Sequence, residues 1–437
     1  MENAVRDWRG RSYLPGPVPA DRKRMFWLSL AAMAAISPLQ YGYAALLAQK
    51  EPTLLAVWIA CQAAGALPAL HLVRRGRLSV RVSLALGAAL SGLGLVTAAL
   101  TVAAPSAEGA ATALAGGALG SVSLAALTGY GLLGGLGAGL VYGVCGEVVS
   151  SWFPERPAAR VGLITGAFGY GAVPLLLWAG IAPGATQAAF LTAAAVAVAV
   201  IGTAARHLRL PPALWWPDDV DPRTHALDAA RLRVTPEAAK QFLLAQALRT
   251  RTLPALALIL TCSGAVSVFD VIVVAGTGTW GAVALMVALN GASRSVAMRC
   301  SELFGRRRVL AAVLGALAVG QVLLAAGGAH VGGSPAQANV SAGLLWLGAI
   351  AAGLGGGAFY PLLASLVREF FGTERAGEIH AVIYSAKALA GVGAVALAVA
   401  ALTAPGATLL TAAALAALPA LAAPRLRIPG LPATIPL

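Results

Sequence analysis

Charged residues are scarce in this sequence, and their scarcity excludes most soluble classes of protein. Only 11% of the 437 residues are charged, whereas 59% are hydrophobic. A soluble domain averages about 25% charged residues, which cover its solvated surface. A cytosolic enzyme is therefore excluded. We predict an all-α membrane protein, because helices satisfy their own backbone hydrogen bonds in lipid.

Cysteine and histidine are also rare, and their arrangement does not indicate metal or redox chemistry. The chain has five histidines and four cysteines, and all four cysteines fall inside apolar runs: Cys61, Cys145, Cys262 and Cys300. No CxxC or His-Cys spacing occurs, so neither a disulfide framework nor a metal site is indicated. We expect buried, inert thiols.

Catalytic and nucleotide-binding motifs are absent as well. The sequence has no nucleophile with a base at motif spacing and no phosphate-cradling loop with Lys and Ser/Thr. Lys and Arg exceed Asp and Glu by 31 to 17, but the basic stretches are not interleaved with exposed aromatic residues. We therefore expect no enzymatic activity, no cofactor, no metal and no nucleic-acid partner.

What the sequence does contain is a series of long apolar runs. A spanning helix needs about 20 mostly apolar residues, and that rule predicts twelve transmembrane helices. They cover residues 25–48, 53–73, 82–103, 123–149, 159–181, 185–205, 253–276, 279–300, 309–330, 341–366, 378–402 and 405–424. The first run is too long for a cleavable signal peptide and lacks a small-residue cleavage site.

The basic residues lie almost entirely in alternate loops. Of the 31 Lys and Arg residues, 28 fall on one side of the predicted topology, and Lys50 falls on the other. Arg294 and Lys387 lie inside spans. Because positive charge gathers in cytoplasmic loops, we predict a multi-pass protein of the cytoplasmic (inner) membrane with both termini in the cytoplasm.

The longest polar interval divides the predicted helices into two sets of six. We expect a cytoplasmic arm over residues 1–24, a six-helix bundle over 25–205, a cytoplasmic linker over 206–252, a second six-helix bundle over 253–424 and a cytoplasmic tail over 425–437. The linker includes a stretch compatible with a helix, residues 236–251. Two joined six-helix halves are the layout of a two-repeat secondary transporter, with its site between the halves near the midplane.

Glycine is concentrated on one face of two predicted spans. The fourth span has a glycine at every fourth residue, and the tenth repeats the feature; the residues are Gly131, Gly135, Gly139, Gly143, Gly353, Gly355, Gly356 and Gly357. Four residues make about one helical turn, so a neighbouring helix can approach these backbones closely. Close packing alone explains such faces, and so do two halves that rock against each other.

Two cations inside the predicted spans are the main indication of function. A charge at this depth costs about 2.5 to 3.5 kcal/mol on insertion scales. Arg294 and Lys387 lie at depths that differ by about 5 Å, so both can face one cavity. Asp270 and Glu147 are the acids that could pair with a cation or carry a coupling proton. Without such a pair, the two cations favour an anionic ligand such as a carboxylate.

Polar side chains elsewhere in the spans complete the candidate substrate site. Tyr and Trp are common at membrane interfaces, so the residues set well inside their spans, Tyr41 and Tyr142, are the stronger candidates. The full set of proposed cavity residues is Gln40, Tyr41, Gln62, Tyr142, Trp346, Tyr360 and Tyr384.

Several short runs resemble those of a known protein family. GYGLLGGLGAGLVY at residues 129–142 and WFPER at 152–156 look like the fourth span and following loop of the oxalate/formate antiporter family of the major facilitator superfamily. NGASR at 290–294 with SELFGRRR at 301–308 is similar to its eighth span and basic loop. GGGAFYP at 355–361, FFGT at 370–373, YSAK at 384–387 and the pair Gln40 and Tyr41 complete the likeness, which covers nearly the whole chain.

The resemblance implies the major facilitator fold and transport of small carboxylates. By that likeness Arg294 and Lys387 match the family's substrate-binding cations, and the polar residues above fall near its cavity. Residues 74–81 lack the acid of the superfamily's first basic motif, and Glu302 replaces the Asp of the second. We therefore expect an alternating-access carboxylate transporter with lipid as its surroundings.

Two alternatives stay open at this stage. One is a proton-coupled symporter of monocarboxylates such as lactate or pyruvate, with Asp270 or Glu147 carrying the proton. The other is a non-transporting subunit that kept the fold and binds a partner protein in the membrane. The altered first basic motif and the long, Trp-bearing linker favour this second alternative.

Overall fold

The computed structural model describes residues 4–7, 12–103, 123–225, 238, 240–328, 341–373 and 375–430. In this part of the chain, eleven helical spans are long and apolar enough to cross a membrane. Uninterrupted spans are α3 (Pro52–Arg74), α4 (Val80–Ala103), α10 (Thr186–His207), α13 (Thr252–Gly276), α14 (Trp280–Phe304), α15 (Arg306–Ala326), α16 (Ala342–Phe371) and α19 (Pro405–Ala422).

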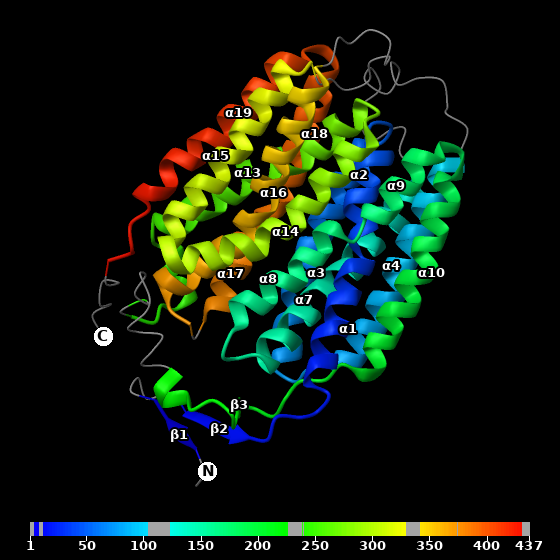
Figure 1. Ribbon diagram of the computed structural model, residues 1–437. Coiled ribbons are helices and arrows are strands. Elements are labelled where there is room, and N and C mark those ends of the chain that lie inside the picture. Colours follow the sequence, from blue (N-terminus) through cyan, green and yellow to red (C-terminus); the bar gives the residue numbers. More distant parts are fainter. Residues whose placement is uncertain are drawn as a thin grey trace.

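The remaining spans are built from shorter helices in series (Figure 1). These are α6 (Leu124–Ala126), η2 (Leu127–Gly134) and α7 (Gly135–Trp152); α8 (Pro157–Tyr170) and α9 (Val173–Ile181); and α17 (Ala376–Ser385) and α18 (Lys387–Thr403). The first predicted span is the series α1 (Arg22–Ala35), η1 (Pro38–Gly42) and α2 (Tyr43–Leu46), which adds a twelfth helical column. The predicted all-α membrane protein is confirmed.

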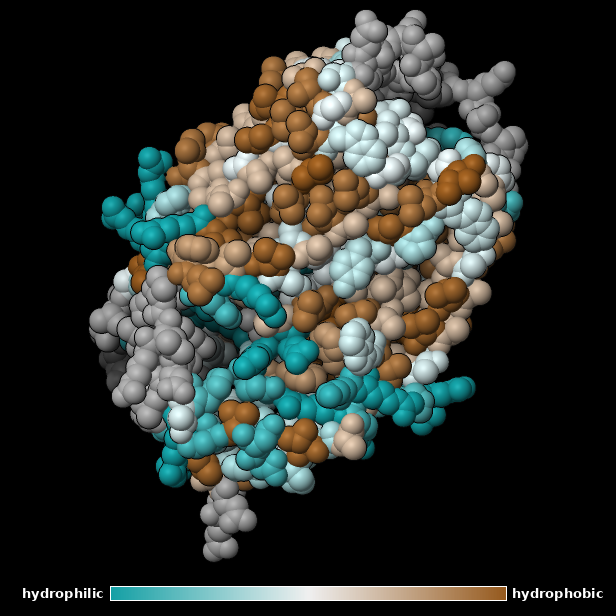
Figure 2. All heavy atoms as spheres, in the orientation of Figure 1, coloured by the Kyte–Doolittle hydropathy of each residue, from teal (hydrophilic) through white to brown (hydrophobic). Residues whose placement is uncertain are grey.

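The outside of the helical bundle is apolar. Leucine side chains stand exposed along many of the helices, among them Leu100, Leu258 and Leu389. Figure 2 shows apolar side chains over the middle of the visible face and hydrophilic ones gathered at the end near the N-terminus. An exposed apolar band of this extent is what lipid-facing helices require. We call the hydrophilic end the basic end.

The helices pack in two sets that meet along two seams. In the first set α3 packs on α7, α4 on α10 and α1 on α8; in the second, α15 and α14 pack on α16, and α13 on α18. Contacts of α8 with α14 and of α3 with α18 join the sets. The predicted domain boundaries stay a prediction.

A small sheet at the basic end is the one element type that the sequence did not suggest. β1 (Val5–Arg6) pairs antiparallel with β2 (Ser12–Gly16), which pairs parallel with β3 (Trp215–Pro217) of the linker. The linker thus pairs with the N-terminal arm through β3. Only α12 (Leu244–Leu248) is helical in the described part of residues 236–251.

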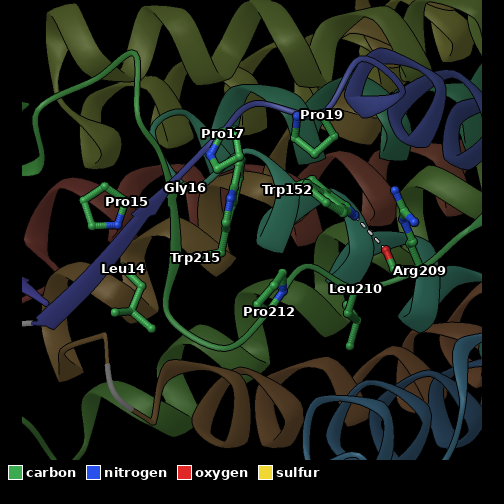
Figure 3. Close-up of a pocket in the computed structure, with 10 residues that line it drawn as sticks. All are labelled: Leu14, Pro15, Gly16, Pro17, Pro19, Trp152, Arg209, Leu210, Pro212 and Trp215. Carbon is green, nitrogen blue, oxygen red and sulfur yellow. Dashed lines mark hydrogen bonds between the residues drawn. The ribbon is translucent and has the colours of Figure 1, made fainter. Parts of the chain in front are cut away.

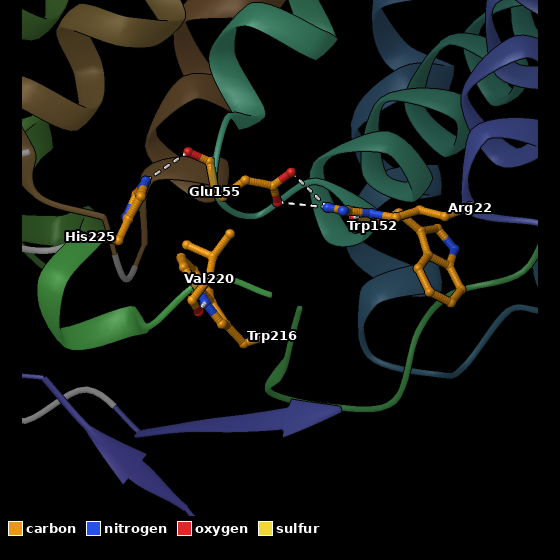
Figure 4. A network of polar contacts seen from close by, with 6 residues as sticks. All are labelled: Arg22, Trp152, Glu155, Trp216, Val220 and His225. Carbon is orange, nitrogen blue, oxygen red and sulfur yellow. Dashed lines mark hydrogen bonds and ion pairs between the residues drawn. The ribbon is translucent and has the colours of Figure 1, made fainter. Parts of the chain in front are cut away.

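Ion pairs and aromatic rings fasten this sheet to the first set of helices. Arg22 makes a 2.7 Å ion pair with Glu155, whose backbone oxygen contacts His225 (Figure 4). Trp152 donates a hydrogen bond to the backbone oxygen of Arg209 at 2.7 Å (Figure 3). Arm, linker and the loop after α7 are therefore one packed unit.

Glycine allows the two sets to meet backbone to backbone. A Cβ on Gly166 of α8 would lie 2.7 Å from the backbone oxygen of Gly291 on α14, and a Cβ on Gly169 would lie 2.5 Å from the Cα of Gly291. Real Cβ atoms do not approach backbone so closely. The predicted glycine face of the fourth span is used inside the first set: Gly135 and Gly139 lie against the backbone of α3.

Enlarging the glycine at the seam tests this packing. We expect Gly166→Val to destabilise the protein by about 1–3 kcal/mol, because overpacking forces the backbones apart. Gly202→Val is the matched control, since a Cβ at Gly202 on α10 meets nothing within 4 Å. Thermal unfolding in detergent measures both variants. Equal melting temperatures for the two would contradict the close seam.

Candidate functional site

Interrupted helices carry several of the polar residues buried at the seams. Pro38 lacks a backbone N–H and its ring clashes with a carbonyl one turn earlier, and it begins the wide π-helical turn η1, which holds Gln40 and Tyr41. The carbonyl of Leu39 in this turn accepts a hydrogen bond from the Tyr130 hydroxyl at 2.7 Å. Such π-helical turns are frequent at functional sites.

A second interruption places the lysine. α17 ends at Ser385 and α18 begins at Lys387, so the ammonium group extends from the first residue of a new helix. Arg294, by contrast, lies within the uninterrupted α14. Broken helices at mid-membrane depth are common at transporter sites, because backbone that leaves the helix is tolerated only beside a cavity.

A narrow cavity lies where these elements meet between the two sets. It has room of about 10 Å³ for the centre of a water-sized sphere, close to what one water needs. Its lining residues come from both sets of helices: Gln40, Tyr41, Tyr142, Phe168, Arg294, Tyr360, Tyr384 and Lys387. A larger ligand therefore has to displace side chains that now contact one another.

Arg294 is 2% exposed, and its described hydrogen-bond partners are all neutral. Its Nη1 donates to the backbone oxygen of Thr165 at 2.8 Å, and its Nη2 donates to Asn290 Oδ1 at 3.1 Å and to the Tyr41 hydroxyl at 3.3 Å. Its Nε is buried with no partner among the described residues. The guanidinium group lies 5.4 Å from the ring centroid of Tyr360.

Lys387 is 3% exposed and is surrounded by amides and aromatic rings. Its Nζ donates to Gln62 Oε1 at 2.7 Å and to Gln40 Oε1 at 3.1 Å. Three ring centroids lie within 6 Å of Nζ: Phe168 at 5.5 Å, Tyr384 at 5.7 Å and Tyr360 at 5.8 Å. Ring faces attract a cation but do not neutralise it.

The two cations share one wall of the cavity. The Tyr360 ring contacts both Arg294 and Lys387. Opposite Tyr360, Tyr142 stacks on Tyr384 with centroids 5.9 Å apart. Neither cation forms an ion pair with a carboxylate in the part of the chain that the structure describes. The site therefore holds two buried positive charges that only neutral dipoles and ring faces stabilise.

Most of the residues expected from the sequence come together here. Gln40, Tyr41, Tyr142 and Tyr360 line the cavity, and Gln62 holds Lys387 from just behind the lining. Trp346 lies apart from them: it is 37% exposed and packs near Gly281 at the other end of α14 from the basic end.

The two acids lie outside the cavity. Asp270 does not pair with Arg294; it accepts a hydrogen bond from Gln321 of α15. Glu147 lies at the basic end of α7, 3.9 Å from Arg74, and accepts a hydrogen bond from Ser151. Neither carboxyl neutralises a cation of the site.

Sequence reasoning missed three groups that complete the site. Asn290 precedes Arg294 by one turn of α14, and its Oδ1 joins Arg294 to Tyr41. Thr165 contributes only its backbone oxygen, and Phe168 contributes only a ring face. The sequence alone therefore does not indicate either contact. The i, i+4 spacing of Asn290 and Arg294 is the signal that was available.

Contacts close the seam between the sets on both sides of the cavity. Towards the basic end, Arg75 of the first set lies 3.8 Å from Glu378 of the second. Towards the other end, Gln49 donates to the backbone oxygen of Ile272 at 3.3 Å, and Gly180 lies against the Trp280 ring. These contacts join the two sets on either side of the cavity.

A larger hollow lies beneath the arm–linker sheet and is a weaker candidate (Figure 3). Its volume is about 460 Å³, and its lining is mostly proline, leucine and tryptophan. The charged group there, Arg209, already pairs with Asp21 at 3.0 Å. The chemistry of the chain is therefore concentrated at the central cavity. In the described residues, groups of His, Cys, Asp or Glu that could hold a metal ion do not occur.

Comparison with known proteins identifies the fold. The chain is similar to the crystal structure of the nucleoside transporter NupG, with a TM-score of 0.61 and 12% identity over 93% of this chain and 99% of that one. No protein-family model and no curated protein matches the chain. The protein has the major facilitator fold. The narrower likeness to the oxalate/formate antiporter family finds no support in these comparisons.

The unpaired charge on Lys387 leads to a prediction about stability. A buried charge without a counter-charge opposes folding, and even the replacement of a whole buried ion pair by apolar side chains of similar size is often neutral or stabilising by about 1–4 kcal/mol. We expect Lys387→Met to melt at the same temperature as the native protein or higher. Lys240→Met, which removes an exposed charge from the linker, is the control. A marked loss of stability in Lys387→Met alone would show that the ammonium group supports the fold.

Proposed function

We propose that the protein is a secondary transporter that moves small carboxylate anions by alternating access. The observation that supports this proposal is the pair of buried cations, Arg294 and Lys387, that share a cavity and lack a carboxylate partner among the described residues. An anion bound between them would supply the missing counter-charge. Water cannot do so, and the neutral groups already present do so only in part.

The two cations suit the two ends of a small dicarboxylate such as oxalate. A guanidinium group offers two parallel N–H donors to one carboxylate, and an ammonium group acts as a point charge on the other. Arg294 keeps Nε free for this purpose. Tyr41 and Tyr142 would orient the anion, since their hydroxyl groups lie at the cavity.

The remaining polar residues have supporting roles in this proposal. Gln40 and Gln62 hold Lys387 until the substrate arrives, and Tyr360 supports both cations. Trp346 would act at the outer part of the substrate path. The protein would work in the cytoplasmic membrane with both termini in the cytoplasm, which the basic loops favour.

A proton-coupled monocarboxylate symporter is the second candidate. A lactate or pyruvate molecule carries a single negative charge, so a proton transported with it would make the overall transport step electroneutral. The buried carboxyl of Asp270 favours this candidate, and Glu147, which already has Arg74 within 3.9 Å, is the lesser coupling candidate.

Ligand-dependent thermal stability tests the proposal directly. We would heat the purified protein with oxalate, formate, malonate, lactate or pyruvate, and with uridine as a neutral comparison. A ligand present at about 100 times its Kd stabilises the native state by about 2.7 kcal/mol. We expect one carboxylate class to raise the melting temperature, and uridine to have no effect.

Variants of the two cations give this experiment its specificity. Arg294→Lys keeps the charge but removes the planar pair of donors, so we expect the stabilisation to weaken by at least about tenfold in ligand concentration, or about 1.4 kcal/mol. Lys387→Met should abolish it for a dicarboxylate. If the native protein responds to no carboxylate, the site is not an anion site, and the non-transporting subunit with a membrane partner becomes the better explanation.

A further inference from the structure

A buried carboxyl in the second set of helices has no role in the anion site described above. Asp270 lies on α13 and is 2% exposed, and it faces Gln321 of α15, which is 0% exposed. Gln321 Nε2 donates a hydrogen bond to Asp270 Oδ1. Neither residue lines the central cavity.

The Asp270–Gln321 pair lacks one hydrogen-bond donor. Asp270 Oδ2 and Gln321 Oε1 are both buried, and neither has a hydrogen-bond partner among the described residues. Both atoms are acceptors when the carboxyl is ionised. Buried acceptors of this kind are costly when they stay unpaired. One additional hydrogen on the carboxyl would convert Oδ2 into a donor, and the neighbouring amide offers it an unoccupied acceptor.

We propose that Asp270 and Gln321 form a proton-binding site, in which Asp270 carries the proton and Gln321 recognises the neutral carboxylic acid. The amide donates through Nε2 and accepts through Oε1, and a carboxylic acid presents the matching acceptor and donor. An ionised Asp270 would instead leave both Asp270 Oδ2 and Gln321 Oε1 buried without a donor. The pair is thus matched to the protonated state.

The surroundings supply no cation that would hold Asp270 ionised. In the described residues, no ionisable group forms an ion pair or hydrogen bond with Asp270. Neither α12 nor α19 carries a charged or titratable residue, and α2 carries only Tyr43. The other elements packed against α13 carry Lys387 on α18; Tyr360, Arg368 and Glu369 on α16; Glu378, His380 and Tyr384 on α17; Arg294, Arg299, Cys300 and Glu302 on α14; and Arg306, Arg307 and Arg308 on α15.

The cations on these elements lie far along their helices from the Asp270–Gln321 pair or contact other groups. Arg308 precedes Gln321 by 13 residues of α15, which is about 20 Å of helix. Arg294 and Lys387 face the central cavity, and Arg306 and Arg307 pair with Glu369. Burial without a counter-charge favours the neutral form of the Asp270 carboxyl.

A chain of hydrogen bonds that starts at Arg294 of the anion site ends at Ser267, about one helical turn from Asp270. Ser267 lies one turn before Asp270 on α13 and accepts a hydrogen bond from Asn290 Nδ2 at 3.2 Å. Asn290 in turn accepts from Arg294 at 3.1 Å. Loss of the proton from Asp270 would place a negative charge about one turn from this path. The role of this pair in coupling rests on the proposed function, whereas the protonation of Asp270 does not.

Infrared spectroscopy of the purified protein tests the protonation itself. A neutral buried carboxylic acid gives a C=O stretching band, separate from the bands of ionised carboxylates, that shifts to lower frequency in D₂O. We expect this band at neutral pH in the native protein and its complete loss in Asp270→Asn. Asp221→Asn, which removes an exposed carboxyl of the linker, should leave the band unchanged. An identical spectrum for native protein and Asp270→Asn overturns the proposal.

Thermal stability against pH provides a second measurement on the same proteins. An unfolded carboxyl is ionised above about pH 5, so a protonated Asp270 means that the folded state binds one proton more than the unfolded state. Stability therefore falls as pH rises. Asn presents an amide donor at every pH, so we expect Asp270→Asn to remain folded and to lose less stability between about pH 6 and about pH 9. Equal slopes for native protein and variant count against the proposal.

These outcomes separate the proton site from the proposed function. A carboxylate that stabilises the protein while the infrared band is missing overturns the proton site and leaves the anion site standing. The infrared band without any carboxylate effect leaves the proton site standing and removes its role in coupling. Gln321→Leu distinguishes recognition from burial alone, since it should shift the carbonyl band by removing its hydrogen bonds without deleting it.

Discussion

The burial of two positive charges without a negative partner is the constraint on which the centre of this molecule depends. Packed helices bury Arg294 and Lys387 almost completely, so nearby dipoles and rings have to stabilise them. Amide oxygens point at the ammonium group, a backbone oxygen points at the guanidinium group, and one tyrosine ring supports both. The negative ends of these dipoles face the two cations and hold them in place without neutralising them.

Helix breaks are how the fold meets this constraint. A continuous helix uses its own carbonyls and presents only side chains, whereas the turn at Pro38 and the break before Lys387 reorient both backbone and side chains at the same level. Glycine contributes in a different way. It removes side chains where α8 meets α14, so that the two sets lie close enough for Tyr41 of one to contact Asn290 and Arg294 of the other.

The sequence predicted the fold well because lipid imposes a simple rule on composition. Each predicted span from 53–73 onwards overlaps a helix or a series of helices, and the first span departs only by its π-helical turn. Arg294 and Lys387 could be found because charge is rare in apolar runs. The backbone of Thr165 could not, since its contribution depends on a partner from another helix, whereas Asn290 offered its i, i+4 spacing to Arg294. Trp346 was selected by residue type, and type alone does not say which face of a helix is turned inward.

The strand pairing beneath the bundle has a consequence for how the protein is made. Leu14 is paired with Trp215, so the arm and its partner strand are separated along the chain by all six helices of the first set. During synthesis, the arm therefore lacks its partner strand β3 until those helices have been made. The partner strand is synthesised before the helices of the second set, so the arm can pair with it before they form.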